Sequence, residues 1–126
     1  MREIKFRGQR IGDYKWFYGD LLLDYRPMGG PDTPVIRSKR EDWGDDFNAV
    51  DSTTVGQYTG LKDKNGKMIF EGDIFRTARS TIATIEWEKE GRFLGFTGDR
   101  KIVYINREPQ VEVIGNIHDN PELLAK

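Results

Sequence analysis

The stretch that decides the fold reads Leu61-Lys62-Asp63-Lys64-Asn65-Gly66-Lys67-Met68-Ile69-Phe70. Apolar residues stand on both sides of Asn65-Gly66, and this dipeptide is typical of a two-residue turn between antiparallel strands. Both central residues of a type I′ turn need a positive φ, which Asn and Gly tolerate better than other residues. The sequence therefore predicts a hairpin over residues 61–70 with a type I′ turn at its tip.

Short strand-like runs extend in both directions from this hairpin. They are rich in aromatic and β-branched residues, are broken by Gly, Asp and Asn, and begin at Ile4, Trp16, Ile82, Phe93 and Ile102, with a last run at residues 111–114. A period of two is typical of strands, and their regular spacing predicts a small barrel or sandwich. Helical signals are limited to one turn at residues 119–124 and a second around residues 41–43.

Two neighbouring segments interrupt the strand pattern. Residues 25–34 are dense in Pro and Gly, which break regular structure. Residues 41–51 carry five acids and no base. We therefore expect an irregular excursion over about residues 25–51, preceded by an N-terminal β unit and followed by a barrel-like part over about residues 55–120, all within one domain of residues 1–126.

Composition limits the classes of function. The 126 residues carry a net charge of −1 and contain no Cys, which excludes disulfides, thiol catalysis and Cys-type zinc sites. No apolar run approaches the ~20 residues of a membrane-spanning helix. The N-terminus enters a strand pattern at once, so we expect no signal peptide and a cytoplasmic location. A Gly-rich phosphate-binding loop is absent from the sequence, and we predict no cofactor.

We predict no catalytic residue and no metal ligand. His118 is the single His, and we expect it to pack or to cap. Glu71 and Asp73 flank Gly72, and two carboxylates at this spacing on a strand would form an acid/base pair. The interpretation that we favour is a turn at Gly72, capped by its acidic neighbours. For the acids of residues 42–46, which are oxygen donors suited to a divalent cation, we favour a solvated loop.

Basic residues are spread along the chain with acids between them. They are Arg2, Lys5, Arg7 and Arg10 near the N-terminus, and Arg76, Arg79, Arg92, Arg100 and Lys101 further on. Small β-barrels bind nucleic acid through faces that combine such charges with aromatic rings. We favour a solvated surface and keep a nucleic-acid partner as the alternative.

Trp43 and Phe47 stand out within the acidic segment. Two large aromatic rings on a solvated loop would reduce solubility, so we expect them to dock. Docking onto the barrel and docking onto a second copy of the chain are equally compatible with the sequence. These two residues are our predicted interaction residues.

Residues 55–74 read VGQYTGLKDKNGKMIFEGDI and include Asn65-Gly66 and Glu71-Gly72-Asp73. This stretch is similar to the central signature of the YopX-like family of phage and prophage proteins. Residues 2–7 (REIKFR) and 113–124 (VIGNIHDNPELL) are similar to its two termini. Residues 25–50 and 76–110 carry no family pattern.

The resemblance implies a mainly β protein with an SH3-like barrel element, encoded by a phage or prophage. It also implies a homo-oligomer, with a hexamer as one candidate, and no established activity. We therefore expect a non-enzymatic, oligomeric binding or assembly module with an unidentified protein partner. The alternatives are a nucleic-acid-associated accessory factor and, less favoured, a hydrolase that uses Glu71, Asp73 or the acidic segment.

Overall fold

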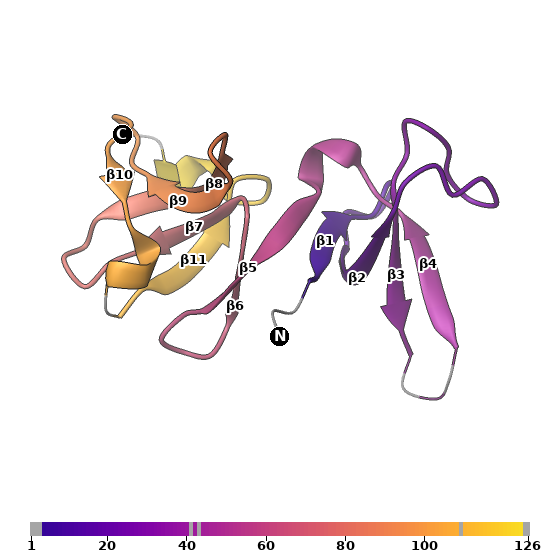
Figure 1. Cartoon of the computed structure of the whole chain (residues 1–126), viewed down its shortest axis with the longest axis horizontal. Coiled ribbons are helices and arrows are strands. Elements are labelled where there is room, and N and C mark those ends of the chain that lie inside the picture. The colour runs from indigo at the N-terminus through magenta and orange to yellow at the C-terminus, as the bar shows by residue number, and fades with distance from the viewer. Residues whose placement is uncertain (1–3, 41, 43, 109, 125–126) are drawn as a thin grey trace. The chain divides into compact units, whose positions relative to one another are not determined.

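The computed structural model describes residues 4–40, 42, 44–108 and 110–124. All strand pairs in it are antiparallel, which confirms the mainly β prediction. The chain separates into two compact units, residues 1–58 and 59–126, and the boundary lies close to the predicted start of the barrel-like part. Figure 1 labels the strands of both units.

The first unit is a sheet with a small core. Its strands are β1 (Phe6–Gln9), β2 (Trp16–Leu22), β3 (Val35–Lys39), β4 (Asp45–Ala49) and the first part of β5 (Gly56–Lys62), in the order β4-β3-β2-β1-β5, with a 3₁₀ turn η1 (Ser52–Thr54) before β5. Val35, Ile36 and Val50 are fully buried and form the centre of this unit. Few apolar side chains are therefore buried in its 58 residues.

The irregular excursion predicted for residues 25–51 is wrong in its second half. Strands β3 and β4 form an antiparallel hairpin there, in which Val35 pairs with Ala49 and Arg37 with Phe47. The Pro- and Gly-rich composition ends at Pro34, and β3 begins at the next residue, Val35. Strand β4 lies at the sheet edge, and edge strands accept charged residues such as Asp45 that would destabilise a central strand. Its acidic composition therefore concealed a strand.

The second unit contains a five-stranded sheet in the order β10-β9-β8-β7-β11. The strands of this unit after β5 are β6 (Met68–Phe70), β7 (Asp73–Arg76), β8 (Ile82–Glu88), β9 (Arg92–Phe96), β10 (Ile102–Val103) and β11 (Glu112–Asn116). Its 3₁₀ turns are η2 (Ile105–Arg107) and η3 (Pro121–Leu124). Strand β6 is the hydrogen-bonded neighbour of β5. Within the described residues both sheets are open, so the SH3-like closure is not confirmed.

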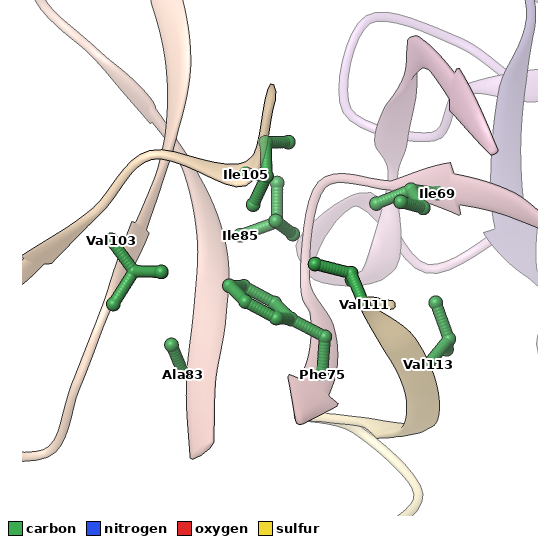
Figure 2. Packing of buried hydrophobic residues seen from close by; sticks show 8 residues of the cluster. All are labelled: Ile69, Phe75, Ala83, Ile85, Val103, Ile105, Val111 and Val113. Carbon is green, nitrogen blue, oxygen red and sulfur yellow. The ribbon is translucent and has the colours of Figure 1, made fainter. Parts of the chain in front are cut away.

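One continuous apolar cluster holds the second unit together. Figure 2 shows its eight buried members, which are Ile69, Phe75, Ala83, Ile85, Val103, Ile105, Val111 and Val113. Phe75 on β7 is fully buried. It lies opposite Ala83 on β8 and opposite Val113 on β11. Residues opposite each other on one face of a sheet pack closely, so this ring joins three strands into one core.

The hairpin predicted at residues 61–70 is confirmed, but its type I′ turn is wrong. Gly66 has a φ of 81°, whereas Asn65 is not among the residues with positive φ. The Gly66 amide donates to the Asp63 carbonyl oxygen at 3.0 Å, so Lys64 and Asn65 are the central turn residues. The carboxylate of Asp63 accepts hydrogen bonds from two amides inside the loop, which stabilises this longer turn.

The helical predictions have different outcomes. The terminal turn is confirmed as η3. A further 3₁₀ turn, η2, begins at Ile105, so the strand predicted from residue 102 is shorter than expected. The turn around residues 41–43 lies largely outside the described residues, since positions 41 and 43 are not described. In the part of the chain that the structure describes, no helix has the length and apolar character to cross a membrane.

Candidate functional site

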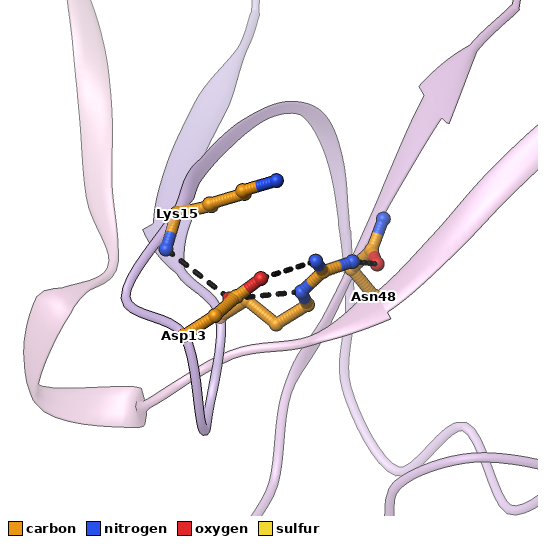
Figure 3. Close-up of polar contacts among 4 residues, drawn as sticks. Asp13, Lys15 and Asn48 are labelled. Carbon is orange, nitrogen blue, oxygen red and sulfur yellow. Dashed lines mark hydrogen bonds and ion pairs between the residues drawn. The ribbon is translucent and has the colours of Figure 1, made fainter.

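The loop that joins β1 to β2 is held by one guanidinium group. Arg10 Nε donates to Asp13 Oδ1 at 3.0 Å, Arg10 Nη2 donates to Asp13 Oδ2, and Arg10 Nη1 donates to Asn48 Oδ1 on β4 at 2.9 Å (Figure 3). The Arg10 amide also donates to the carbonyl oxygen of Lys15 at 2.7 Å. Both ends of the loop are therefore fixed to the sheet of the first unit.

The ion pair shifts the acid–base equilibria of both partners. The hydrogen bonds from Arg10 lower the pKa of Asp13 to about 2, and Asp13 raises the pKa of Arg10. The Lys15 amide adds a further hydrogen bond to the Asp13 carboxylate, at 3.3 Å. The Asp13 carboxylate therefore stays ionised across the physiological pH range and keeps its ion pair with Arg10.

This clamped loop presents two large apolar side chains to solvent. Ile11 is 58% exposed and Tyr14 is 72% exposed. Tyr14 also has a φ of 62°, a left-handed conformation that costs a non-Gly residue about 1–3 kcal/mol. Ser80 and Arg100 have the same conformation in turns of the second unit, so this φ belongs to the geometry of the loop. The arrangement can offer a preorganised apolar contact at low entropic cost.

Phe47, one of the two predicted interaction residues, lies on β4 and stacks on Tyr25. The two ring centroids are 5.1 Å apart and the ring planes are 12° apart. This contact is made within the first unit, so Phe47 docks onto its own chain. Trp43 lies outside the described residues, and its docking stays a prediction.

The predicted signature turn joins β6 to β7. Gly72 has a φ of 92°, and its amide donates to the Ile85 carbonyl oxygen at 2.8 Å. Asp73 is buried, and its Oδ2 accepts a hydrogen bond from the Phe70 amide at 2.7 Å. Glu71 is half-buried in the same turn. The geometry is that of a capped turn, which is the role that the sequence favours for these residues.

Asp63 is a structural residue that the sequence reasoning missed. Its Oδ1 accepts the amides of Asn65 and Lys67, each at 2.9 Å, and its Oδ2 accepts the Val113 amide on β11 at 3.0 Å. Burial raises the pKa of Asp63, but these three hydrogen bonds outweigh burial and hold the pKa below its ordinary value. An Asp two residues before Asn-Gly is a local signal for the turn, but not for the bond to Val113.

Most of the predicted basic residues are bound to acids. The ion pairs are Arg10–Asp13, Arg76–Glu112, Arg92–Glu88, Arg100–Glu86 and Lys101–Asp99. Arg7 is buried and lies over the ring of Trp16 at 4.8 Å, while Arg2 lies outside the described residues. These pairs neutralise much of the charge that a nucleic-acid surface would need.

The remaining polar residues of interest have structural contacts. The His118 amide donates to Asn116 Oδ1 at 2.9 Å in the turn between β11 and η3. In the acidic segment, Arg40 binds Asp42 at 3.3 Å and Asp46 at 3.5 Å. Within the described ranges, no group of three or more His, Asp or Glu side chains is placed to hold a metal ion.

Comparison with known proteins identifies the family. The model of the family described as YopX protein matches residues 5–125. The chain belongs to the YopX family. Among solved structures, this YopX-family chain is similar to the crystal structure of protein EF1440 from Enterococcus faecalis, with 25% sequence identity and a TM-score of 0.61 over 98% of this chain and 99% of that one. No curated protein matches the chain.

Proposed function

We propose that this YopX-family protein is a non-enzymatic binding and assembly module that associates with copies of itself through the loop of residues 10–15. The observation that carries the proposal is the clamped loop with Ile11 and Tyr14 at its surface. Tyr and large aliphatic side chains contribute binding energy when a partner covers them, and a loop already in its bound conformation loses little entropy on binding.

The sheet edges give a second reason to expect self-association. Strand β4 is at one edge of its sheet, and an open edge presents unpaired backbone groups to other chains. Pairing or packing against a second copy covers such an edge in a closed oligomer. Family membership supports a phage or prophage origin and a hexamer as one candidate assembly, and we also propose a cytoplasmic location.

We propose a non-enzymatic function because the carboxylates singled out in the sequence bind other groups of the same chain. Asp73 accepts the Phe70 amide inside a turn, and Arg40 binds two acids of the acidic segment. A general acid or base must reach a substrate proton. These carboxylates bind the chain's own donors, so a structural role explains each of them.

Light scattering coupled to size exclusion tests self-association. We expect a mass above the 14.6 kDa of one chain at high micromolar concentration, and a monomer for the double variant Ile11→Ser with Tyr14→Ser. The matched control is Ile102→Ser with Tyr104→Ser, which changes the same two residue types in the second unit, where they are 48% and 37% exposed. The control should keep the assembly.

Two outcomes contradict the proposal. A monomeric unmodified chain at that concentration would rule out self-association. An assembly that survives in the Ile11/Tyr14 double variant would show that another surface makes the contact. We expect both double variants to fold, because all four positions are on the surface. Circular dichroism of each variant checks this.

A further inference from the structure

A pocket in the first unit gathers three basic side chains around an exposed tyrosine ring. It has a volume of about 430 Å³ and lies where the pairing of β2 with β3 stops. Its chemistry comes from Lys5, Tyr18, Asp20, Arg37 and Lys39. We refer to it as the Tyr18 pocket.

The sheet register explains why these side chains converge. Asp20 pairs with Arg37 across β2 and β3, and side chains two residues apart on a strand point to the same face. Tyr18 therefore shares a face with Asp20, and Lys39 shares that face with Arg37. Tyr18 also pairs with Arg7 on β1, which places Lys5, two residues earlier, beside the same group.

A close backbone approach shapes the pocket floor. A side chain at Gly19 would place its Cβ 2.0 Å from the Arg37 carbonyl oxygen, so only glycine fits at this position. The Ser38 hydroxyl donates to the Tyr18 carbonyl oxygen at 2.7 Å and holds the two strand ends together. The pocket is therefore part of the fold and needs no rearrangement to form.

Cationic side chains outnumber acids at the pocket, although the whole chain is slightly negative. Its lining holds three cationic side chains and one acid, Asp20, which accepts hydrogen bonds from Arg37 at 2.7 and 3.3 Å. That contact also fixes the direction of the Arg37 guanidinium. A second acid, Asp45, pairs with Lys39 across β3 and β4 and interacts electrostatically with Arg37. Lys39 is exposed at the rim, and the Tyr18 ring is 45% exposed between the charges.

We propose that the Tyr18 pocket binds single-stranded nucleic acid, with a base stacked on Tyr18 and the adjacent phosphates held by Lys5, Arg37 and Lys39. An exposed aromatic ring flanked by cations is the arrangement that proteins use for unpaired bases and their backbone. A duplex keeps its bases stacked in pairs and cannot offer one to a ring inside a pocket. The proposal is independent of self-association, because it uses none of the residues of the 10–15 loop.

Fluorescence anisotropy with a labelled oligothymidylate of about 12 nucleotides tests the proposal on the full chain. For three phosphate contacts, log K should fall with log salt with a slope of about −2 between about 50 and 200 mM. The double variant Lys5→Ala with Lys39→Ala should reduce that slope to about −0.7. The matched control, Lys62→Ala with Lys89→Ala, removes the same charge from exposed positions of the second unit and should leave the slope unchanged.

Tyr18 separates stacking from simple charge attraction. Tyr18→Phe keeps the ring and should bind as tightly as the unmodified chain, whereas Tyr18→Ala should lose about tenfold in affinity. Because Tyr18→Phe removes only a hydroxyl, it stays folded and keeps the comparison valid if Tyr18→Ala is unstable.

Three results would overturn the proposal. The first is no binding at about 50 mM salt, where phosphate contacts are strongest. The second is an equal loss in the pocket variant and the Lys62/Lys89 control, which would indicate attraction by net charge alone. The third is competition by a phosphorylated peptide as effective as by the oligonucleotide, which would indicate an anion site without base recognition.

Discussion

The two units of the chain use their apolar side chains differently. The second unit buries eight of them in one cluster that joins five strands and the loop before β11. The first unit buries Val35, Ile36 and Val50 fully, yet it also contains every large apolar side chain among the described residues that is more than half exposed, namely Ile4, Ile11, Tyr14 and Leu23. Buried apolar area stabilises a fold, whereas exposed area is available to a partner.

The turns differ in the same way. Three turns of the second unit, which begin at Asp63, Thr77 and Thr97, share two features. The side-chain oxygen of the first residue accepts a hydrogen bond from a loop amide. The fourth residue of each turn, which is Gly66, Ser80 or Arg100, has a positive φ. The β1–β2 loop of the first unit also has a side-chain oxygen that accepts a loop amide, at Asp13, and a positive φ, at Tyr14, but it is also held by the Arg10 side chain and leaves Ile11 and Tyr14 in solvent. The second unit therefore buries more of its large apolar side chains, whereas the first leaves more of them exposed.

Among the variants that test this comparison, Phe75→Ala should cause the largest loss of stability. Removing a fully buried ring from the centre of the second unit leaves a cavity and should lower the free energy of unfolding by about 3–5 kcal/mol. Urea denaturation followed by circular dichroism measures it. Leu23→Ala in the first unit is the control and should change the midpoint little, because that side chain is 73% exposed. Equal midpoints for the two variants would contradict the assignment of the core.

Asp63→Asn should have the next largest effect. The amide replaces a charged acceptor of three backbone hydrogen bonds, and we expect a loss of about 1–3 kcal/mol in the free energy of unfolding. The same substitution at Asp13, an exposed carboxylate of the first unit, should change stability far less. A greater loss of stability in Asp13→Asn than in Asp63→Asn would contradict the structural role that we assign to Asp63.

The pH dependence of stability gives Asp63 a second readout. Its pKa is lower in the folded chain than in an unfolded one, where it is ~3.9, so the folded state binds fewer protons. The contribution of Asp63 is therefore complete above about pH 4–5 and is lost as the pH falls through the folded pKa. Denaturation midpoints of the unmodified chain and Asp63→Asn should converge on acidification.

Gly66→Val should have the smallest of the three effects, about 1 kcal/mol or slightly more. A Cβ at this position meets no atom within 4 Å, so the cost comes only from the φ of 81°, which a β-branched residue resists. Gly98→Val is the matched control, because Gly98 is equally open and has no positive φ. If both variants have the same midpoint in chemical denaturation, Gly66 is not constrained by its turn.

Much of the fold was predictable because its signals are local. The period-two runs predicted the mainly β class, and Asn65-Gly66 predicted the hairpin, although not its turn type. Strand β4 was missed because strand prediction depends on apolar alternation, and an edge strand with Asp45 and Asp46 has little of it. The candidate site was missed for a related reason, since a lone Arg-Ile-Gly-Asp-Tyr loop has no motif.

The sequence by itself determined the alternation of strands and turns, the hairpin at Asn65-Gly66 and the membership of a family. These depend on φ/ψ preferences and on residues a few positions apart, which a single sequence displays. Tertiary structure alone decided that Asp63 binds Val113, fifty residues away in the chain, that Arg10 reaches Asn48, and that Lys5, Tyr18, Arg37 and Lys39 converge on one pocket. Such contacts depend on strand order and register, which are set by packing of the whole unit.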